Sequence, residues 1–110
     1  MSGKIKELDS AENFQTETET GLVLVDFFAD WCRPCQMQLP ILNEVAEKMG
    51  DKVRFLKVNT DKFGDIARQF GVSGIPTLIV FKNGQVVERF DRLQQENTLV
   101  SVLGNHAATA

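Results

Sequence analysis

The segment that decides the fold runs from Leu22 to Cys35 and reads LVLVDFFADWCRPC. A near-continuous apolar run, interrupted only by Asp26, fills its first half and is typical of a strand covered on both faces, as in a parallel sheet. After Cys35 the apolar residues recur at helical spacing, at Met37, Ile41, Leu42, Val45, Ala46 and Met49. The segment therefore predicts a buried strand followed by a long helix that starts at a pair of cysteines.

Patterns on either side of this segment predict the other elements. Strands are expected at residues 4–8, 53–58, 77–81 and 85–90, the last polar enough to be a sheet edge. Helices are expected after an N-cap at Ser10, over residues 61–70, and around Leu93–Leu103. This order, β-α-β-α-β-α-β-β-α, predicts an α/β fold with a mixed sheet and helices on both faces.

Turn and helix-end signals punctuate this pattern. Asn83-Gly84 predicts a two-residue type I′ hairpin, because both central residues of that turn need a positive φ. The polar run at residues 16–20 predicts a solvated turn, and Pro40 predicts a kink in the long helix. Gly104 predicts the end of the last helix, which leaves residues 105–110 as a flexible tail after an ordered core at 4–104.

Composition excludes several classes of protein. The chain has 110 residues, of which 43% are hydrophobic and 25% charged, which favours one globular domain over residues 1–110, expected to be monomeric. Its net charge is -3 and it has no lysine- or arginine-rich run, so we expect no nucleic-acid partner. No apolar stretch approaches the ~20 residues of a membrane span, and no secretory signal follows Met1, so we expect a cytoplasmic protein.

The two cysteines, Cys32 and Cys35, are placed for redox chemistry. In the first turn of a helix, residues three apart have Cβ atoms about 5–6 Å apart, close enough to form a disulfide after a small adjustment. The free N–H groups and the positive dipole end of the helix favour a thiolate on Cys32, and Pro34 fits in this turn because its missing N–H has no helical partner. We therefore expect Cys32 to be the exposed nucleophile and Cys35 the resolving thiol.

Two other interpretations of the cysteine pair remain open at this point. A structural disulfide across two residues would constrain the unfolded chain very little. A tetrahedral metal site needs four ligands, and His106, the only histidine, lies in the expected tail. An iron–sulfur cluster shared between two chains would satisfy the ligand count.

Four motifs together resemble the thioredoxin family from about residue 4 to residue 104. They are Val25-Asp26-Phe27-Phe28-Ala29-Asp30, Trp31-Cys32-Arg33-Pro34-Cys35, Gly74-Ile75-Pro76-Thr77 and Phe81-Lys82-Asn83-Gly84. The resemblance implies a thioredoxin fold with about five strands and four helices. It also implies a protein disulfide oxidoreductase that reduces disulfides in target proteins, with no bound cofactor and with electrons supplied by a flavoprotein reductase.

The resemblance also assigns roles to single residues. Cys32 and Cys35 match the redox pair, Asp26 the buried carboxylate that handles the proton of the resolving cysteine, and Lys57 the lysine near it. Pro76 matches a cis-proline that faces the disulfide, and the target-binding groove would be lined by Trp31, Arg33, Pro34, Gly74, Ile75, Pro76 and Asp91. Without the resemblance, Asp26 could be a hydrogen-bonded structural residue, Lys57 a surface lysine and Trp31 a core residue.

The chain departs from the family pattern at three places. Arg33 stands where glycine is usual, Phe28 replaces a common tryptophan, and Asp91-Arg92 occupies a position beside the groove where glycine is common. These departures bear on target preference and redox potential, and they leave two rival functions open. One is a more oxidising thiol oxidase or isomerase, and the other is a binding or assembly subunit that uses the same groove without electron transfer.

Overall fold

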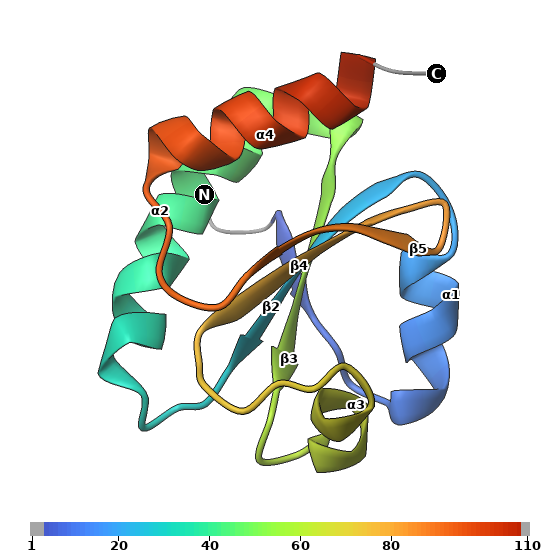
Figure 1. The fold of residues 1–110 in the computed structure, drawn as a ribbon, viewed down its shortest axis with the longest axis vertical. Coiled ribbons are helices and arrows are strands. Elements are labelled where there is room, and N and C mark those ends of the chain that lie inside the picture. Colours follow the sequence, from blue (N-terminus) through green and yellow to red (C-terminus); the bar gives the residue numbers. More distant parts are fainter. Residues whose placement is uncertain (1–3, 109–110) are drawn as a thin grey trace.

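A five-stranded mixed sheet forms the centre of the protein, in the strand order β1-β3-β2-β4-β5 (Figure 1). The computed structural model describes residues 4–108. The strands are β1 (Ile5–Glu7), β2 (Leu22–Phe28), β3 (Arg54–Asn59), β4 (Thr77–Lys82) and β5 (Gln85–Phe90). The first three run parallel, whereas β4 is antiparallel to β2 and β5 to β4. The mixed sheet predicted from the sequence is confirmed.

Two layers of helices cover this sheet. The helices are α1 (Phe14–Thr18), α2 (Arg33–Met49), α3 (Gly64–Gln69) and α4 (Glu96–Ala108), with short 3-10 helices at Ala11–Asn13 and Gly50–Lys52. One apolar cluster packs α2 and α4 against one face of the sheet, and a second packs α1 and α3 against the other. Figure 1 shows α2 and α4 at the left and top, and α1 and α3 at the right and bottom.

The central strand β2 pairs along both edges, as its apolar run predicts. Val25 lies opposite Leu56 of β3 and opposite Ile79 of β4. Because side chains alternate along a strand, Leu22 and Leu24 join the cluster under α2 and α4, while Val25 and its like-facing neighbours join the other. The same alternation places Asp26 on the α2 face of the sheet.

The buried face of α2 differs from the predicted one near the start of the helix. Met37, which the spacing assigned to the apolar face, is 57% exposed, and its neighbour Gln38 is 0% exposed. Gln38 precedes Leu42 by four residues and Val45 by seven, so it lies on their face of the helix. α2 continues through Pro40, and the kink predicted there stays a prediction.

The hairpin between β4 and β5 has the predicted conformation. Asn83 has a φ of 50° and Gly84 a φ of 84°, as a type I′ turn requires. The side-chain oxygen of Asn83 also accepts a hydrogen bond of 2.9 Å from the N–H of Gly21, the residue that precedes β2. The turn is therefore tied to the start of the central strand.

Three expectations near helix starts and turns are confirmed only in part. The helix expected over residues 61–70 starts only at Gly64, because the Asn59 side chain accepts hydrogen bonds from the N–H groups of Asp61 and Lys62 and holds a turn there. The polar run at 16–20 is not entirely a solvated turn, since α1 includes Thr18, which is buried and donates to the carbonyl of Phe14. Ser10 precedes the first 3-10 helix, but its side chain makes no capping hydrogen bond.

The last helix does not end at Gly104, where the sequence predicts its end. α4 begins at Glu96, after Leu93, and continues past Gly104 to Ala108. Two contacts hold its last turn to the hairpin strands. Lys82 Nζ donates to the carbonyl of His106 at 2.7 Å, and His106 Nε2 lies 2.9 Å from Glu88 Oε2. Residues 109–110 lie outside the described part, and within residues 4–108 no helix is long and apolar enough to cross a membrane.

Ending the chain after Gly104 should therefore lower the free energy of unfolding. The change removes the contacts of His106 with Glu88 and Lys82, and we expect a loss of about 1–3 kcal/mol in urea unfolding. The control Asn105→Ala alters an exposed side chain of the same turn and should shift stability by less than about 0.5 kcal/mol. An unchanged unfolding midpoint in the shortened chain would favour the flexible tail instead.

Candidate active site

A disulfide between Cys32 and Cys35 lies at the N-terminus of α2, with the two Cα atoms 5.2 Å apart. Cys32 is the N-cap residue of the helix and has an extended backbone. The backbone N–H of Cys35 points at Cys32 Sγ, with the nitrogen 3.2 Å from the sulfur. This N–H and the positive end of the helix dipole both stabilise negative charge on Cys32, so the geometry favours Cys32 as the thiolate.

The segment before β4 lies against the disulfide. The Ile75–Pro76 peptide bond is cis, as the family resemblance implied, and the carbonyl oxygen of Ile75 lies 3.7 Å from Cys32 Sγ. Thr77 Oγ1 donates to the carbonyl of Gly74 at 2.6 Å and so closes this turn. Segments more than forty residues apart in sequence therefore meet at the disulfide.

Both cysteines are buried in the disulfide form. Each is only 4% exposed, so the predicted burial of Cys35 is confirmed, whereas the predicted exposure of Cys32 is wrong for this state. Ala29 packs with the two cysteines, and Phe28 and Ile75 cover them further. The side chains that do reach solvent around the pair belong to Trp31, Arg33, Pro34, Gln36 and Met37.

Trp31 is a surface residue and not part of the core. It is 71% exposed, and its indole Nε1 donates a hydrogen bond of 2.9 Å to Asp61 Oδ2. The bond fixes a large aromatic side chain beside the disulfide. The sequence analysis did not identify Asp61, which follows β3 and meets Trp31 only in the folded chain.

Asp26 lies beneath the disulfide in an environment that opposes its ionisation. The residue is 2% exposed, and its Oδ1 has no hydrogen-bond partner among the described residues. Burial raises the pKa of this carboxyl from 3.8 to about 7, and the positive charge of Lys57 offsets part of that shift. Asp26 and Cys35 line the same cavity of about 130 Å³, which is large enough to admit water.

Lys57 is the register partner of Asp26 on β3 and is partly buried. Its ammonium group lies 3.7 Å from Glu7 Oε1 and 5.2 Å from the centre of the Phe28 ring. Lys57 also lines the cavity that Asp26 and Cys35 share. Glu7, on the edge strand β1, is a second neighbour that the sequence analysis did not identify.

The residues after β5 reach the same end of the sheet. Phe90 pairs with Leu78 near the start of β4, so Asp91 follows close to the Pro76 turn. Asp91 is exposed and accepts a hydrogen bond of 2.9 Å from Arg89 Nε, and Arg89 also donates to the carbonyl of Gly71. The structure thus brings Asp91 to the side of the site, with no contact to either cysteine among its hydrogen bonds.

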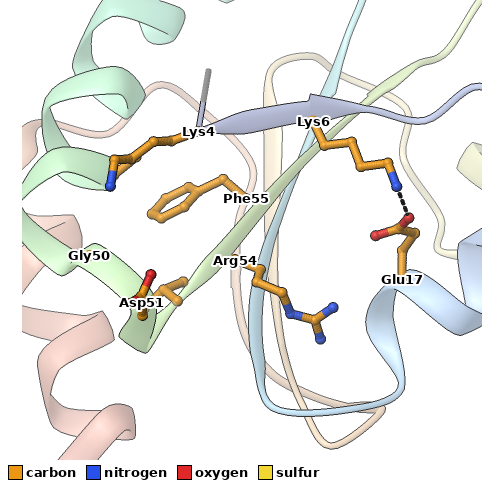
Figure 2. A pocket seen from close by; sticks show the side chains of 9 residues that line it. Lys4, Lys6, Glu17, Gly50, Asp51, Arg54 and Phe55 are labelled. Atoms are coloured by element: carbon orange, nitrogen blue, oxygen red, sulfur yellow. Dashed lines mark hydrogen bonds and ion pairs between the residues drawn. The ribbon is translucent and has the colours of Figure 1, made fainter. Parts of the chain in front are cut away.

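A larger cleft of about 430 Å³ lies elsewhere, beside β1 and the C-terminal end of α2 (Figure 2). The 17 residues of α2 separate it from the disulfide by roughly 25 Å along the helix. Its charged groups largely have partners within the protein: Lys6 pairs with Glu17, and Arg54 donates to the carbonyl of Thr20. Within residues 4–108, no group of three His, Cys, Asp or Glu side chains could hold a metal ion.

Comparison with known proteins agrees with this geometry. The thioredoxin family model matches residues 5–105. The chain belongs to the thioredoxin family. It is 45% identical to a thioredoxin of Chlamydia caviae over 98 residues, which is 89% of this chain and 95% of that protein. It is 40% identical to a thioredoxin of Bacillus subtilis over 95 residues, 86% of this chain and 91% of that protein.

A plant relative and a solved structure extend the comparison. Chloroplastic thioredoxin Y of rice is 47% identical over 78 residues, 71% of this chain and 46% of that protein. A solved thioredoxin mutant of Halobacterium salinarum matches with a TM-score of 0.87 and 30% identity, over 97% of this chain and 94% of that one. The protein is thus a protein disulfide oxidoreductase with a thioredoxin fold and a redox-active cysteine pair.

Replacing Asp26 by asparagine should stabilise the protein in a pH-dependent way. The folded-state pKa of about 7 exceeds the ordinary value of 3.8, so the protonated Asp26 carboxyl stabilises the folded wild-type at low pH. This contribution decreases as pH rises between the two values and is absent above them. The difference limits the gain of Asp26→Asn to about 4 kcal/mol near pH 8, and the gain should vanish near pH 4. Urea unfolding at both pH values measures it.

The control for this prediction is Asp30→Asn, which alters an exposed carboxylate near the same cavity. It should leave the pH dependence of unfolding as in the wild-type. A gain for Asp26→Asn that is equal at both pH values would show that the carboxyl does not titrate in this window.

Proposed function

We propose that this protein acts as a reductant of disulfide bonds in target proteins. The observation that carries the proposal is the cysteine pair at the N-terminus of α2, whose two members have different surroundings. Cys32 Sγ accepts the N–H of Cys35 and lies against Ile75. Cys35 shares a cavity with Asp26, whose Oδ1 has no hydrogen-bond partner among the described residues. This asymmetry supports different roles for the two sulfurs.

In the first step, the Cys32 thiolate attacks one sulfur of a target disulfide. The target S–S bond breaks, its other sulfur leaves as a thiolate and takes up a proton, and Cys32 becomes joined to the target in a mixed disulfide. The groove around Cys32 would hold the target through Trp31, Arg33, Pro34, Gly74, Ile75, Pro76 and Asp91.

In the second step, Cys35 resolves the mixed disulfide. Asp26 accepts the proton of the Cys35 thiol, directly or through water in the shared cavity, and the Cys35 thiolate attacks Cys32 Sγ. The bond between Cys32 Sγ and the target sulfur breaks, and that sulfur leaves as a thiolate and takes up a proton. The target has then gained two electrons, and the Cys32–Cys35 disulfide has formed. A carboxyl with a pKa of about 7 suits this task, because this pKa is near the ambient pH. It is also closer to the pKa of a thiol than the pKa of an ordinary carboxyl is.

Lys57 and the electron supply complete the proposal. The positive charge of Lys57 lowers the raised pKa of Asp26. The ammonium group of Lys57 also contacts Glu7 and the ring of Phe28. A flavoprotein reductase would return two electrons to the disulfide, with no cofactor bound to this chain. We further propose a monomer in the cytoplasm, where thiols are kept reduced and a reductant of this kind can be recharged.

Reduction of a small disulfide-containing protein with a dithiol as electron donor tests this function. The wild-type should exceed the dithiol-only rate, and Cys32→Ser should abolish the excess because it removes the nucleophile. Cys35→Ser should instead accumulate a mixed disulfide with the substrate, visible as a covalent adduct in a non-reducing gel.

The double variant Cys32→Ser, Cys35→Ser separates this function from that of a binding subunit. A scaffold role would survive the loss of both thiols, whereas the reductase role would not. Wild-type turnover that does not exceed the dithiol-only rate would refute the proposal.

Arg33 should make the protein a slightly weaker reductant than a chain with glycine at this position. Its positive charge between the cysteines favours the thiolate and therefore the reduced state. Arg33 is exposed, so screening keeps the effect small, and Arg33→Gly should lower the reduction potential by at most about 20 mV. Equilibration with a dithiol buffer measures the potential, and an increase would contradict the electrostatic explanation and favour a role in target contact.

A further inference from the structure

Gln38 is a fully buried polar residue on α2, one turn after Cys35. Both ends of its side-chain amide bond to one residue far away in sequence. Gln38 Nε2 donates to the carbonyl of Gln94 at 3.0 Å, and the backbone N–H of Gln94 donates to Gln38 Oε1 at 2.8 Å. The side chain thus pairs with the main chain of Gln94 in both directions.

The paired residue belongs to the connection between β5 and α4, residues 91–95. A second side chain orders this connection from within, since Gln94 Nε2 donates to the carbonyl of Arg92 at 3.1 Å. At its start, Asp91 is held by Arg89. Gln38 therefore ties this connection to the helix that carries the cysteines.

The connection 91–95 lies between that helix and the Pro76 turn. Phe90 pairs with Leu78, so the chain leaves β5 at the end of the sheet where Pro76 enters β4. In Figure 1 the chain then passes beside α2 on its way to α4, in agreement with the contact to Gln38. Asp91 and Arg92 are both exposed there and carry opposite charges.

We propose that Gln38 is a positioning residue that holds the connection 91–95 as a fixed wall of the target groove. The inference rests on the proposed function and deepens it. Gln38 has no access to solvent and does not contact a target itself. It fixes the position of Asp91 and Arg92, which contact the target. It therefore determines the affinity for protein targets and not the rate of thiol exchange.

The physical reason lies in the energetics of a buried amide. An apolar residue of the same size would fill the space on α2 equally well, beside Leu42 and Val45. It would remove the hydrogen-bond partners that Gln38 provides to the N–H and carbonyl of Gln94. The connection 91–95 would then move so that these two groups could hydrogen-bond to water. Several residues would satisfy the packing at this position, but glutamine also makes hydrogen bonds of fixed direction to the main chain of Gln94.

The test compares Gln38→Leu with the wild-type in two assays. The exchange rate of the Gln94 amide hydrogen should rise by at least about tenfold relative to amides of β2, because its acceptor is gone. The KM for a protein disulfide should rise several-fold, while kcat, the reduction potential and the reaction with a small aromatic disulfide stay within about twofold of the wild-type.

Val45→Ala is the matched control. Val45 is equally buried on the same face of α2, so this variant lowers global stability and leaves the Gln38–Gln94 bonds in place. It should not change the KM for the protein substrate. Gln38→Met, which is unbranched and also lacks the amide, replaces Gln38→Leu if the latter does not fold.

Three outcomes would overturn the inference. They are an unchanged exchange rate of the Gln94 amide, an equal loss of activity toward protein and small disulfides, and a rise in KM for Val45→Ala that matches that of Gln38→Leu. If the wild-type itself reduced no protein disulfide, the proposed function would fail together with the inference.

Discussion

The burial of β2 on both faces is the constraint on which the rest of the structure depends. Both of its edges are paired, and its apolar residues divide between the two apolar clusters of the protein. A strand held in this way cannot shift its register, because a shift by one residue would exchange the two faces. Its C-terminal end is therefore a fixed point, and the cysteines follow it after a short turn.

This constraint also explains why a carboxyl group lies where it costs stability. Alternation along β2 directs Asp26 toward α2, so its side chain cannot reach solvent without disrupting the strand. Ionisation in this place is unfavourable, and the same free energy makes the carboxylate, once formed, a stronger base than an exposed one. A loss of stability at neutral pH and a capacity to accept a proton are two consequences of one burial.

Local signals in the sequence were sufficient for the framework of the site. The apolar run of β2, the cysteine at the start of α2 and the Asn83-Gly84 turn each depend on neighbouring residues, and each was predicted correctly. Contacts between distant segments were not predictable in this way. Neither the pairing of Gln38 with Gln94 nor the bond from Trp31 to Asp61 has a local signature, since the partners lie 56 and 30 residues apart.

The surroundings of Lys57 show how such distant contacts tune the site. A phenylalanine at position 28 has no polar atom, so it meets the ammonium group of Lys57 only through the face of its ring. Glu7 attracts the same ammonium group from the edge strand. The positive charge of Lys57 offsets only part of the effect of burial on Asp26, so the pKa of that carboxyl remains near 7. The edge strand β1, which carries no cysteine and no groove residue, thus reaches the surroundings of the site through the contact between Glu7 and Lys57.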